Sequence, residues 1–199
     1  MPIDATTLDP DPIRQLEAWI GEAADAAVPL PNAFALATAD GDGMPSVRFV
    51  LLHGIDSAGL RFYTNRASRK GRDLAVNPWA AAAFWWPALN RQARVTGPVR
   101  LLPEADALAY WRTRPREAQL SATASAQSQE IASRDELEAL VRAVAERHPD
   151  EVPLPPTWGG YLIDPRTVEL WENRSDRLHD RVEYRRGADG SWHPRRLQP

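Results

Sequence analysis

Short strand-like runs, separated by turn-forming residues, most limit how this chain can fold. Short strands that recur about every 8–12 residues, with few helices between them, are typical of a barrel or a sandwich. There is no strand–helix alternation and no G-x-G-x-x-G motif, so a Rossmann fold and a P-loop are poor fits. The sequence therefore predicts a mainly β fold. The runs lie at residues 33–39, 46–53, 60–64, 80–86, 92–101, 160–163, 167–171, 181–186 and 191–197.

Few helices are expected beside these strands. The first covers residues 12–27, where apolar side chains recur at helical spacing and Asp11 precedes Pro12 as a cap. Gly97-Pro98 is expected to interrupt the strand at 92–101, and the Ala- and Ser-rich stretch 121–129 to form a loop. The other helices are expected at residues 68–76, 103–112 and 134–147.

Composition and charge exclude several classes of protein. The formal net charge of −3 provides no basic field for nucleic acid. No apolar run of about 18 residues is present, so no membrane-spanning helix is expected. Residues 1–12 lack the basic and apolar regions of a signal peptide. The chain has no cysteine, which excludes disulfides and thiolate chemistry and leaves the cytoplasm as the default location.

Lysine is almost absent: of 24 basic residues, 23 are arginine and one, Lys70, is lysine. Either a compact ammonium fits there and a planar guanidinium does not, or the lysine survives by chance on a solvated helix face. Ser68 and Arg69 precede it where a strand leads into a helix, and free N–H groups at a helix start favour an anion. The stretch 68–70 therefore suggests a phosphate site, with a capped surface helix as the alternative.

A second candidate site is RLHDR at residues 177–181. In an extended segment Arg177, His179 and Arg181 would share one face, and Trp171 could wall the same pocket. Two guanidinium groups beside an imidazole suit a planar, anionic ligand, whereas a polar edge strand is the alternative. The four histidines show no metal-ligand spacing and no G-x-S-x-G motif occurs, so neither a metal site nor a serine hydrolase is expected.

Taken together, several motifs resemble the pyridoxamine 5′-phosphate oxidase family, from about Asp11 to Pro199. Their length and order argue against chance agreement. The motifs are RFVLLH (48–53), FYTN-x-x-SRK (62–70), RQ (91–92), RPRE-x-QL (114–120), QS (127–128), VPLPP-x-WGGY (152–161), RLHDR (177–181) and the closing RRLQP.

The resemblance implies an FMN-binding split β-barrel of Greek-key type with flanking helices. It would be a homodimer that holds FMN in a cleft between its subunits. Residues 1–199 would form this single domain, with an N-terminal segment and helix at 1–32 and a C-terminal part at 152–199 that completes the barrel and active site.

The resemblance also assigns site residues. Arg177 and His179 would pack on the substrate's pyridine ring as the catalytic residues, and no metal is implied. The substrate-binding residues would be His53, Tyr110, Arg114, Arg177 and His179. The FMN-binding residues would be Arg48, Tyr63, Thr64, Arg69, Lys70, Gln92, Gln127, Ser128, Trp171 and Arg181.

The chain departs from the family on the substrate side. The family grips the substrate phosphate with a lysine, a tyrosine, an arginine and a serine. Tyr110 and Arg114 match, but the lysine position is His53 and the serine position is Ala118. The family's N-terminal Arg-x-x-Tyr has no counterpart in residues 1–12. An ordinary histidine, with a pKa of about 6.5, is mostly neutral at pH 7 and is a weaker anion partner than lysine.

The activity implied is oxidation of pyridoxamine or pyridoxine 5′-phosphate to pyridoxal 5′-phosphate. A hydride would pass from substrate C4′ to flavin N5, and O₂ would reoxidise the flavin to give peroxide. One alternative keeps FMN but changes the substrate, because relatives that oxidise phenazine precursors also lack the lysine. Another is a non-catalytic flavin- or haem-binding module on the same barrel, which has no evident need for Arg177 and His179.

Overall fold

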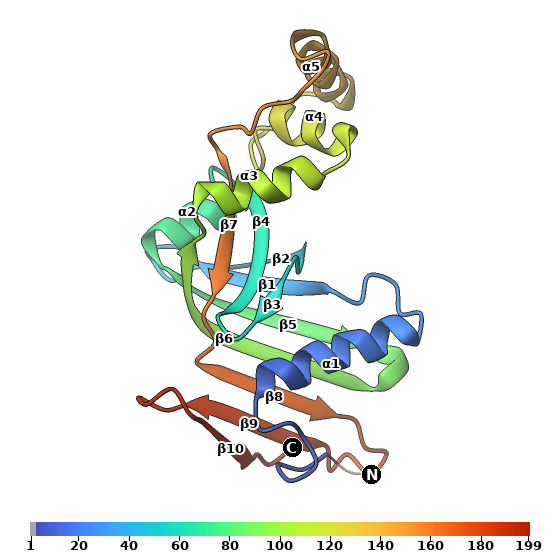
Figure 1. Ribbon diagram of the computed structural model, residues 1–199, viewed down its shortest axis with the longest axis vertical. Coiled ribbons are helices and arrows are strands. Elements are labelled where there is room, and N and C mark those ends of the chain that lie inside the picture. Colours follow the sequence, from blue (N-terminus) through green and yellow to red (C-terminus); the bar gives the residue numbers. More distant parts are fainter. Residues whose placement is uncertain (1–2) are drawn as a thin grey trace.

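The computed structural model describes residues 3–199 as a curved sheet with helices on and beside it (Figure 1). The strands are β1 (Ala33–Ala39), β2 (Pro45–Leu51), β3 (Ile55–Asp56), β4 (Gly59–Asn65), β5 (Trp79–Trp86), β6 (Arg91–Leu101), β7 (Trp158–Ile163), β8 (Thr167–Glu172), β9 (Asp180–Arg186) and β10 (Trp192–Arg196). The α-helices are α1 (Pro12–Asp25), α2 (Arg69–Val76), α3 (Glu104–Thr113), α4 (Arg116–Ala124) and α5 (Arg134–Arg147).

All the strand pairs are antiparallel, and β6 joins the two parts of the sheet. The main path runs β10-β9-β8-β6-β5-β1-β2, while β4 pairs with β3 and β7. Residues 91–96 of β6 lie between β5 and β8, and residues 99–101 pair with β7. This half-barrel with flanking helices confirms the mainly β fold predicted from the strand spacing.

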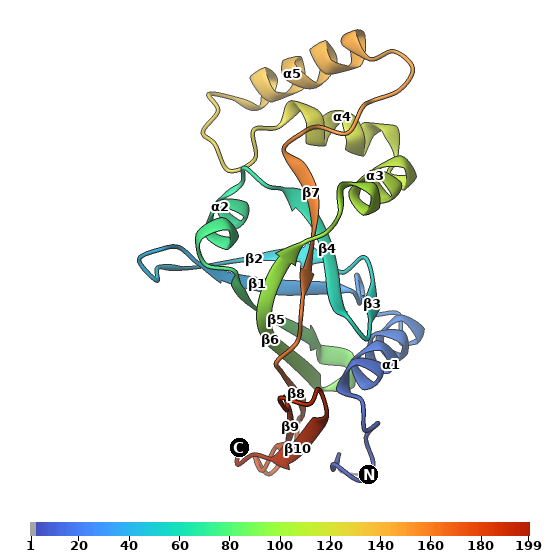
Figure 2. The same cartoon turned by 60° about the vertical axis from the view of Figure 1, so that its left-hand side comes forward.

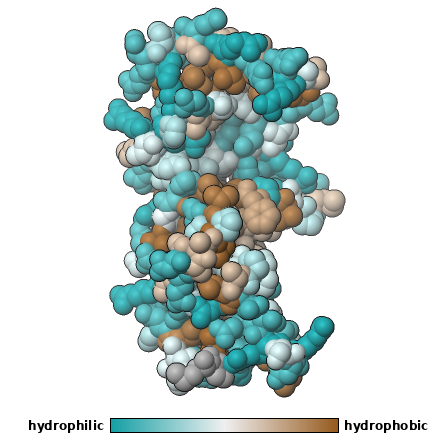
Figure 3. Space-filling view, turned by 90° about the vertical axis from the view of Figure 1, so that its right-hand side faces the viewer, coloured by the Kyte–Doolittle hydropathy of each residue, from teal (hydrophilic) through white to brown (hydrophobic). Residues whose placement is uncertain are grey.

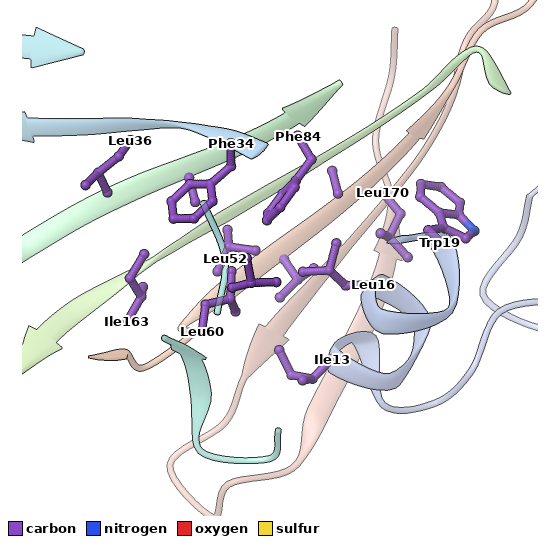
Figure 4. Close-up of a cluster of buried hydrophobic side chains, with 14 of the residues drawn as sticks. Ile13, Leu16, Trp19, Phe34, Leu36, Leu52, Leu60, Phe84, Ile163 and Leu170 are labelled. Carbon is purple, nitrogen blue, oxygen red and sulfur yellow. The ribbon is translucent and has the colours of Figure 1, made fainter. Parts of the chain in front are cut away.

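The core lies between the inner face of the sheet and α1. Asp11 caps α1 as predicted, because its Oδ1 accepts the Ile13 N–H at 2.9 Å. Leu16 and Trp19 of α1 are buried against side chains of the sheet (Figure 4). Buried and part-exposed residues alternate along β1, which places Phe34 in this core and leaves the alanines of the strand on the outer face.

On β2 and β5, the outer face of the sheet carries large apolar side chains that are exposed within one chain. Val47 and Phe49 of β2 are 68% and 78% exposed, and Trp79 and Trp85 of β5 are 52% and 53% exposed. The space-filling view also shows hydrophobic atoms gathered at mid-height on the side that it presents (Figure 3). Contiguous exposed apolar surface is typical of a protein–protein interface.

Helices α3, α4 and α5 lie at one end of the molecule, and β8, β9 and β10 lie at the other (Figures 1 and 2). The two ends of the chain meet beside β10, where Arg196 pairs with Asp4 Oδ2 at 3.0 Å and donates to Ile3 O at 3.1 Å. Within residues 3–199, no helix is long and apolar enough to cross a membrane.

Two sequence-based expectations about the elements are wrong. Residues 121–124 are the last turn of α4 rather than part of a loop, because Leu120 packs with Trp111 and Val144 in a second apolar cluster that stabilises the helix. Gly97-Pro98 does not interrupt β6, which continues to Leu101 but changes its pairing partners there.

Gly97 allows the backbone of β6 to pass close to the connection between β7 and β8. A Cβ at this position would lie 1.9 Å from the backbone oxygen of Asp164, and neither atom could move away without a shift of the backbone. We therefore expect Gly97→Ala to lower the free energy of unfolding by about 2 kcal/mol or more. A Cβ at Gly21 in α1 would have no atom within 4 Å, so Gly21→Ala should raise the free energy of unfolding by about 0.5–1 kcal/mol. Urea unfolding of both variants measures these changes. A Gly97→Ala variant as stable as the wild type would contradict the close approach.

Candidate active site

The start of α2, directly after β4, forms a cradle around one buried cation. Ser68 caps the helix, and its hydroxyl accepts the Gly71 N–H at 3.4 Å. Lys70 is only 6% exposed, and its Nζ donates to Gln127 Oε1 at 2.9 Å, Thr64 Oγ1 at 3.1 Å and Ser68 Oγ at 3.2 Å. All three acceptors are neutral. The alternative that Lys70 lies on a solvated helix face is therefore wrong.

The surroundings of Lys70 disfavour its charge when no anion is bound. Its pKa is lowered from 10.5 to about 8, first by burial and then by the charge of Arg48, while Asp73 opposes the shift. Lys70 forms no ion pair with a carboxylate of the described residues 3–199. A buried ammonium without a counterion is stabilised by an anion placed beside it, so the cradle fits a phosphate group.

Arg48 of β2 adds a second cation beside Lys70, and Asp73 of α2 orients it. Arg48 Nη1 donates to Thr38 Oγ1 at 2.7 Å and to Leu36 O at 3.2 Å, and its Nη2 lies 3.8 Å from Asp73 Oδ2. Thr38 in turn donates to the same carboxylate oxygen at 2.6 Å. Asp73 is not among the residues predicted from the sequence, because a single carboxylate on a short helix forms no recognisable pattern.

These side chains line one open cleft of about 570 Å³. Its walls come from β2, β4, α2 and the segments that precede and follow α4. Ser128, in the segment after α4, has a φ of 72°, a strained conformation for a non-glycine residue that is found at functional sites. The predicted site residues that line the cleft are Arg48, His53, Tyr63, Thr64, Arg69, Lys70, Arg114, Gln127 and Ser128.

Stacked aromatic rings form a wall beside this cleft. The ring of Tyr63 lies 4.1 Å from that of Tyr110 and 5.6 Å from that of Trp158, and both pairs are nearly parallel. The guanidinium of Arg114 lies over the Trp158 ring at 5.1 Å. Trp158 lies within one of the motifs named above but is not among the site residues predicted from the sequence. Such a wall suits a flat ligand that ends in an anion.

The anion-binding end of this wall has one permanent charge. Arg114 forms no ion pair among residues 3–199, and its Nε is buried without a hydrogen-bond partner. The His53 ring nitrogen Nε2 lies 2.9 Å from the Tyr110 hydroxyl. Burial, and then the charge of Arg114, lower the pKa of His53 from its ordinary value, which favours the neutral form of the ring. Arg114 therefore supplies the charge here, and His53 and Tyr110 supply neutral hydrogen-bonding groups.

A second group of predicted residues lies on β6, β8 and β9. Gln92 is opposite Trp171 in the sheet, and Trp171 is opposite Arg181. The rings of Trp171 and His179 lie 4.8 Å apart, so these two side chains are neighbours. The Arg174 N–H donates to His179 Nδ1 at 3.1 Å, which places the proton of the neutral ring on Nε2.

Arg177, His179 and Arg181 do not share one face of a strand, so that prediction is wrong. β9 begins at Asp180, and residues 173–179 form a loop in which Arg177 has a φ of 65°. Alternation of side chains applies only within extended backbone. The loop is tied to the strand by an ion pair of 2.6 Å between Arg174 Nε and Asp180 Oδ2.

The two groups of residues occupy different parts of one chain. In the sheet, β8 and β2 are separated by β6, β5 and β1, which is roughly 19 Å at about 4.8 Å per strand step. The first group lines the cleft, whereas His179 lines another pocket with the C-terminal residues 197–199. The fold of one chain therefore does not bring the two groups together.

Sequence comparison relates the whole chain to known enzymes. Residues 20–148 match a family model described as pyridoxamine 5′-phosphate oxidase, and residues 158–199 match the pyridoxine 5′-phosphate oxidase C-terminal dimerisation region. The pyridoxine/pyridoxamine 5′-phosphate oxidase of Anaeromyxobacter dehalogenans is 52% identical over 191 residues, 96% of either chain. That of Cupriavidus metallidurans is 47% identical over 197 residues, 99% of this chain and 93% of the relative.

Solved structures confirm the split-barrel fold. PhzG from Burkholderia lata, in complex with tetrahydrophenazine-1-carboxylic acid, has a TM-score of 0.91 and 34% identity, covering 96% of this chain and 94% of that one. A pyridoxamine 5′-phosphate oxidase-related, FMN-binding protein from Nostoc punctiforme has a TM-score of 0.79 and 21% identity, covering 96% and 100%. The second similarity supports the fold alone.

The lowered pKa of Lys70 makes stability depend on pH. Between about pH 8 and 10.5 the unfolded chain keeps the lysine proton and the folded chain loses it, so stability rises with pH in this window. We expect the wild type to gain stability relative to Lys70→Met between pH 8 and 10, in ligand-free urea unfolding. Other titrating groups are shared by both proteins and cancel. A pH-independent difference would show that Lys70 titrates like an exposed lysine.

Proposed function

The chain belongs to the pyridoxamine 5′-phosphate oxidase family, and we propose that it oxidises pyridoxamine and pyridoxine 5′-phosphate to pyridoxal 5′-phosphate, with FMN as cofactor and O₂ as acceptor. The proposal rests on one observation: a single cleft contains two positively charged regions. Lys70 and Arg48 form one of them, and Arg114 forms the other. Two phosphate groups, one of the cofactor and one of the substrate, match this arrangement.

The residues around α2 fit the phosphate end of FMN. Lys70 is a buried cation held by neutral acceptors, and Arg48 and Arg69 line the same cleft. Thr64 and Gln127 already bind each other and Lys70, so they fix the position of the ammonium. Bound FMN would supply the redox chemistry, by carrying two electrons from the substrate to O₂. The protein's part is to bind and orient the ring.

We further propose that the site is completed by a second copy of the chain. The outer face of the sheet is apolar and exposed, and residues 158–199 match a dimerisation region. Strands β8 and β9, with Trp171 and Arg181, belong to that region. In the homodimer the second group of residues would face the first group of the other subunit, so that Gln92, Trp171 and Arg181 contact FMN.

The substrate would lie between the aromatic wall of one subunit and the 173–179 loop of the other. Arg114 would bind the substrate phosphate, assisted by Tyr110 and His53. His179, with its proton on Nε2, would donate a hydrogen bond to the substrate ring, and Arg177 would pack beside it. The strained φ of Arg177 supports a functional role for the loop.

A second candidate function keeps FMN but changes the substrate. His53 is neutral where the family has a lysine, and Ala118 lacks the hydroxyl of the family's serine. Arg114 alone matches a carboxylate better than a phosphate dianion. The similarity to PhzG, which was solved with a phenazine carboxylic acid, favours this alternative, although the identity to the pyridoxine/pyridoxamine 5′-phosphate oxidases is higher.

The proposal is tested by assaying purified protein with FMN and each phosphorylated substrate. We expect a yellow dimer that forms pyridoxal 5′-phosphate and peroxide. Lys70→Arg should weaken FMN binding roughly tenfold, because the larger guanidinium loses the three hydrogen bonds of the buried ammonium. Fluorescence titration measures this dissociation constant. A wild-type dimer that binds FMN but turns over neither substrate would leave the second candidate.

His53 distinguishes the two candidates. The neutral histidine contributes no charge at pH 8, so His53→Lys should lower the KM for pyridoxamine 5′-phosphate roughly tenfold there. The gain should shrink below about pH 6.5, where a bound phosphate favours protonation of the histidine. Comparing the two proteins across pH cancels the titration of the substrate's own phosphate. Equal KM values at pH 8 would show that position 53 does not contact the phosphate.

A further inference from the structure

Glu169 of β8 is a buried carboxylate to which the proposed function assigns no role. It is 4% exposed, although it lies on the outer face of the sheet. It pairs in register with Arg94 of β6, and the two side chains form an ion pair. It also binds Arg181 of β9 with both oxygens: Nε donates to Oε1 at 3.1 Å and Nη2 donates to Oε2 at 3.1 Å.

This bidentate contact fixes the plane of the Arg181 guanidinium. Nη1 of Arg181 also donates to Gln198 O at 2.7 Å, so the carboxylate and the C-terminal backbone together engage three of its five N–H donors. Two donors remain for another ligand. A guanidinium held in this way cannot turn without breaking a fork of two hydrogen bonds, which gives it geometric specificity.

The charges around Glu169 do not cancel. One carboxylate lies between two guanidinium groups, those of Arg94 and Arg181, which leaves a net positive charge on this part of the outer face. The carboxylate therefore orients Arg181 without removing its ability to bind an electron-rich ligand. Preorganised cationic donors of this kind need no rearrangement when the ligand binds.

We propose that Glu169 is a positioning residue of the flavin site, which holds Arg181 so that its two remaining donors face FMN. The inference rests on the proposed function, because it takes Arg181 as a contact to the cofactor. It adds a buried carboxylate to the site and requires that the effect of Glu169 pass through Arg181.

Glu183 provides a matched control. It lies opposite Glu169 in the β8–β9 pair, on the same face of the sheet. Its carboxylate binds Arg185 at 2.7 Å and Arg195 at 2.6 Å rather than Arg181. Glu183→Gln therefore removes a carboxylate of the same face and the same strand pair while leaving the Glu169–Arg181 contact in place.

The test is a double-mutant cycle on FMN binding, with Glu169→Gln, Arg181→Ala and the double variant. Dissociation constants come from flavin fluorescence quenching, and dimer mass comes from sedimentation. We expect Glu169→Gln to weaken FMN binding roughly tenfold and to have no further effect in the Arg181→Ala background. At saturating FMN, both single variants should shift the flavin absorption spectrum. Glu183→Gln should change neither quantity.

Other outcomes would overturn the inference in distinguishable ways. An equal loss from Glu169→Gln in both backgrounds would give Glu169 a general structural role. Normal FMN binding by Arg181→Ala would remove the assumed contact, whereas a wild type that binds no FMN would refute the proposed function itself. If Glu169→Gln does not fold, Glu169→Asp replaces it: the charge is kept but the shorter side chain loosens the fork, and unchanged FMN binding by that variant would refute the inference.

Discussion

The hydrogen bonding of β6 to its three neighbouring strands holds both parts of this structure in place. Near its start, Gln92 lies opposite Trp171 of β8, which fixes one group of site residues. At its end, β6 pairs with β7, which pairs with β4 and so places Thr64 beside the cradle of α2. One strand belongs to both parts, and the close backbone approach at Gly97 lies where β6 passes from its pairing with β8 to its pairing with β7.

The proposed site combines two kinds of cation, and the difference lies in their partners. Arg48 and Arg181 contact buried carboxylates, Asp73 and Glu169, which orient them. Lys70 has only neutral acceptors, and Arg114 has no counterion among residues 3–199. Oriented arginines supply directional donors, whereas the unpaired cations supply charge. A ligand with anionic groups and a flat ring matches both kinds.

The proposed homodimer would explain both the exposed apolar side chains on the outer face and the separation of the two groups of residues. A single chain leaves large apolar side chains such as Phe49 and Trp85 in water, and it separates His179 from the cleft that contains Arg114. In the proposed homodimer, a second copy that covers this face would remove the apolar surface from water and would also bring the missing side chains to the cleft. Association and ligand binding would then depend on the same surface.

The sequence alone determined the features that depend on near neighbours in the chain. The strand-like run at residues 33–39 predicted β1, the Asp11 cap marked the start of α1, and the motif around Lys70 identified the cradle. Motif similarity also named residues far apart in sequence, such as Lys70 and Gln127, but only the tertiary structure showed that they bind each other. It alone revealed the loop around Arg177, the division of the site, and the carboxylates Asp73 and Glu169. These features depend on strand order and burial. Lys70 and Gln127 are 57 residues apart in the sequence, and Arg181 and Glu169 are 12 apart. No local periodicity encodes contacts of this kind.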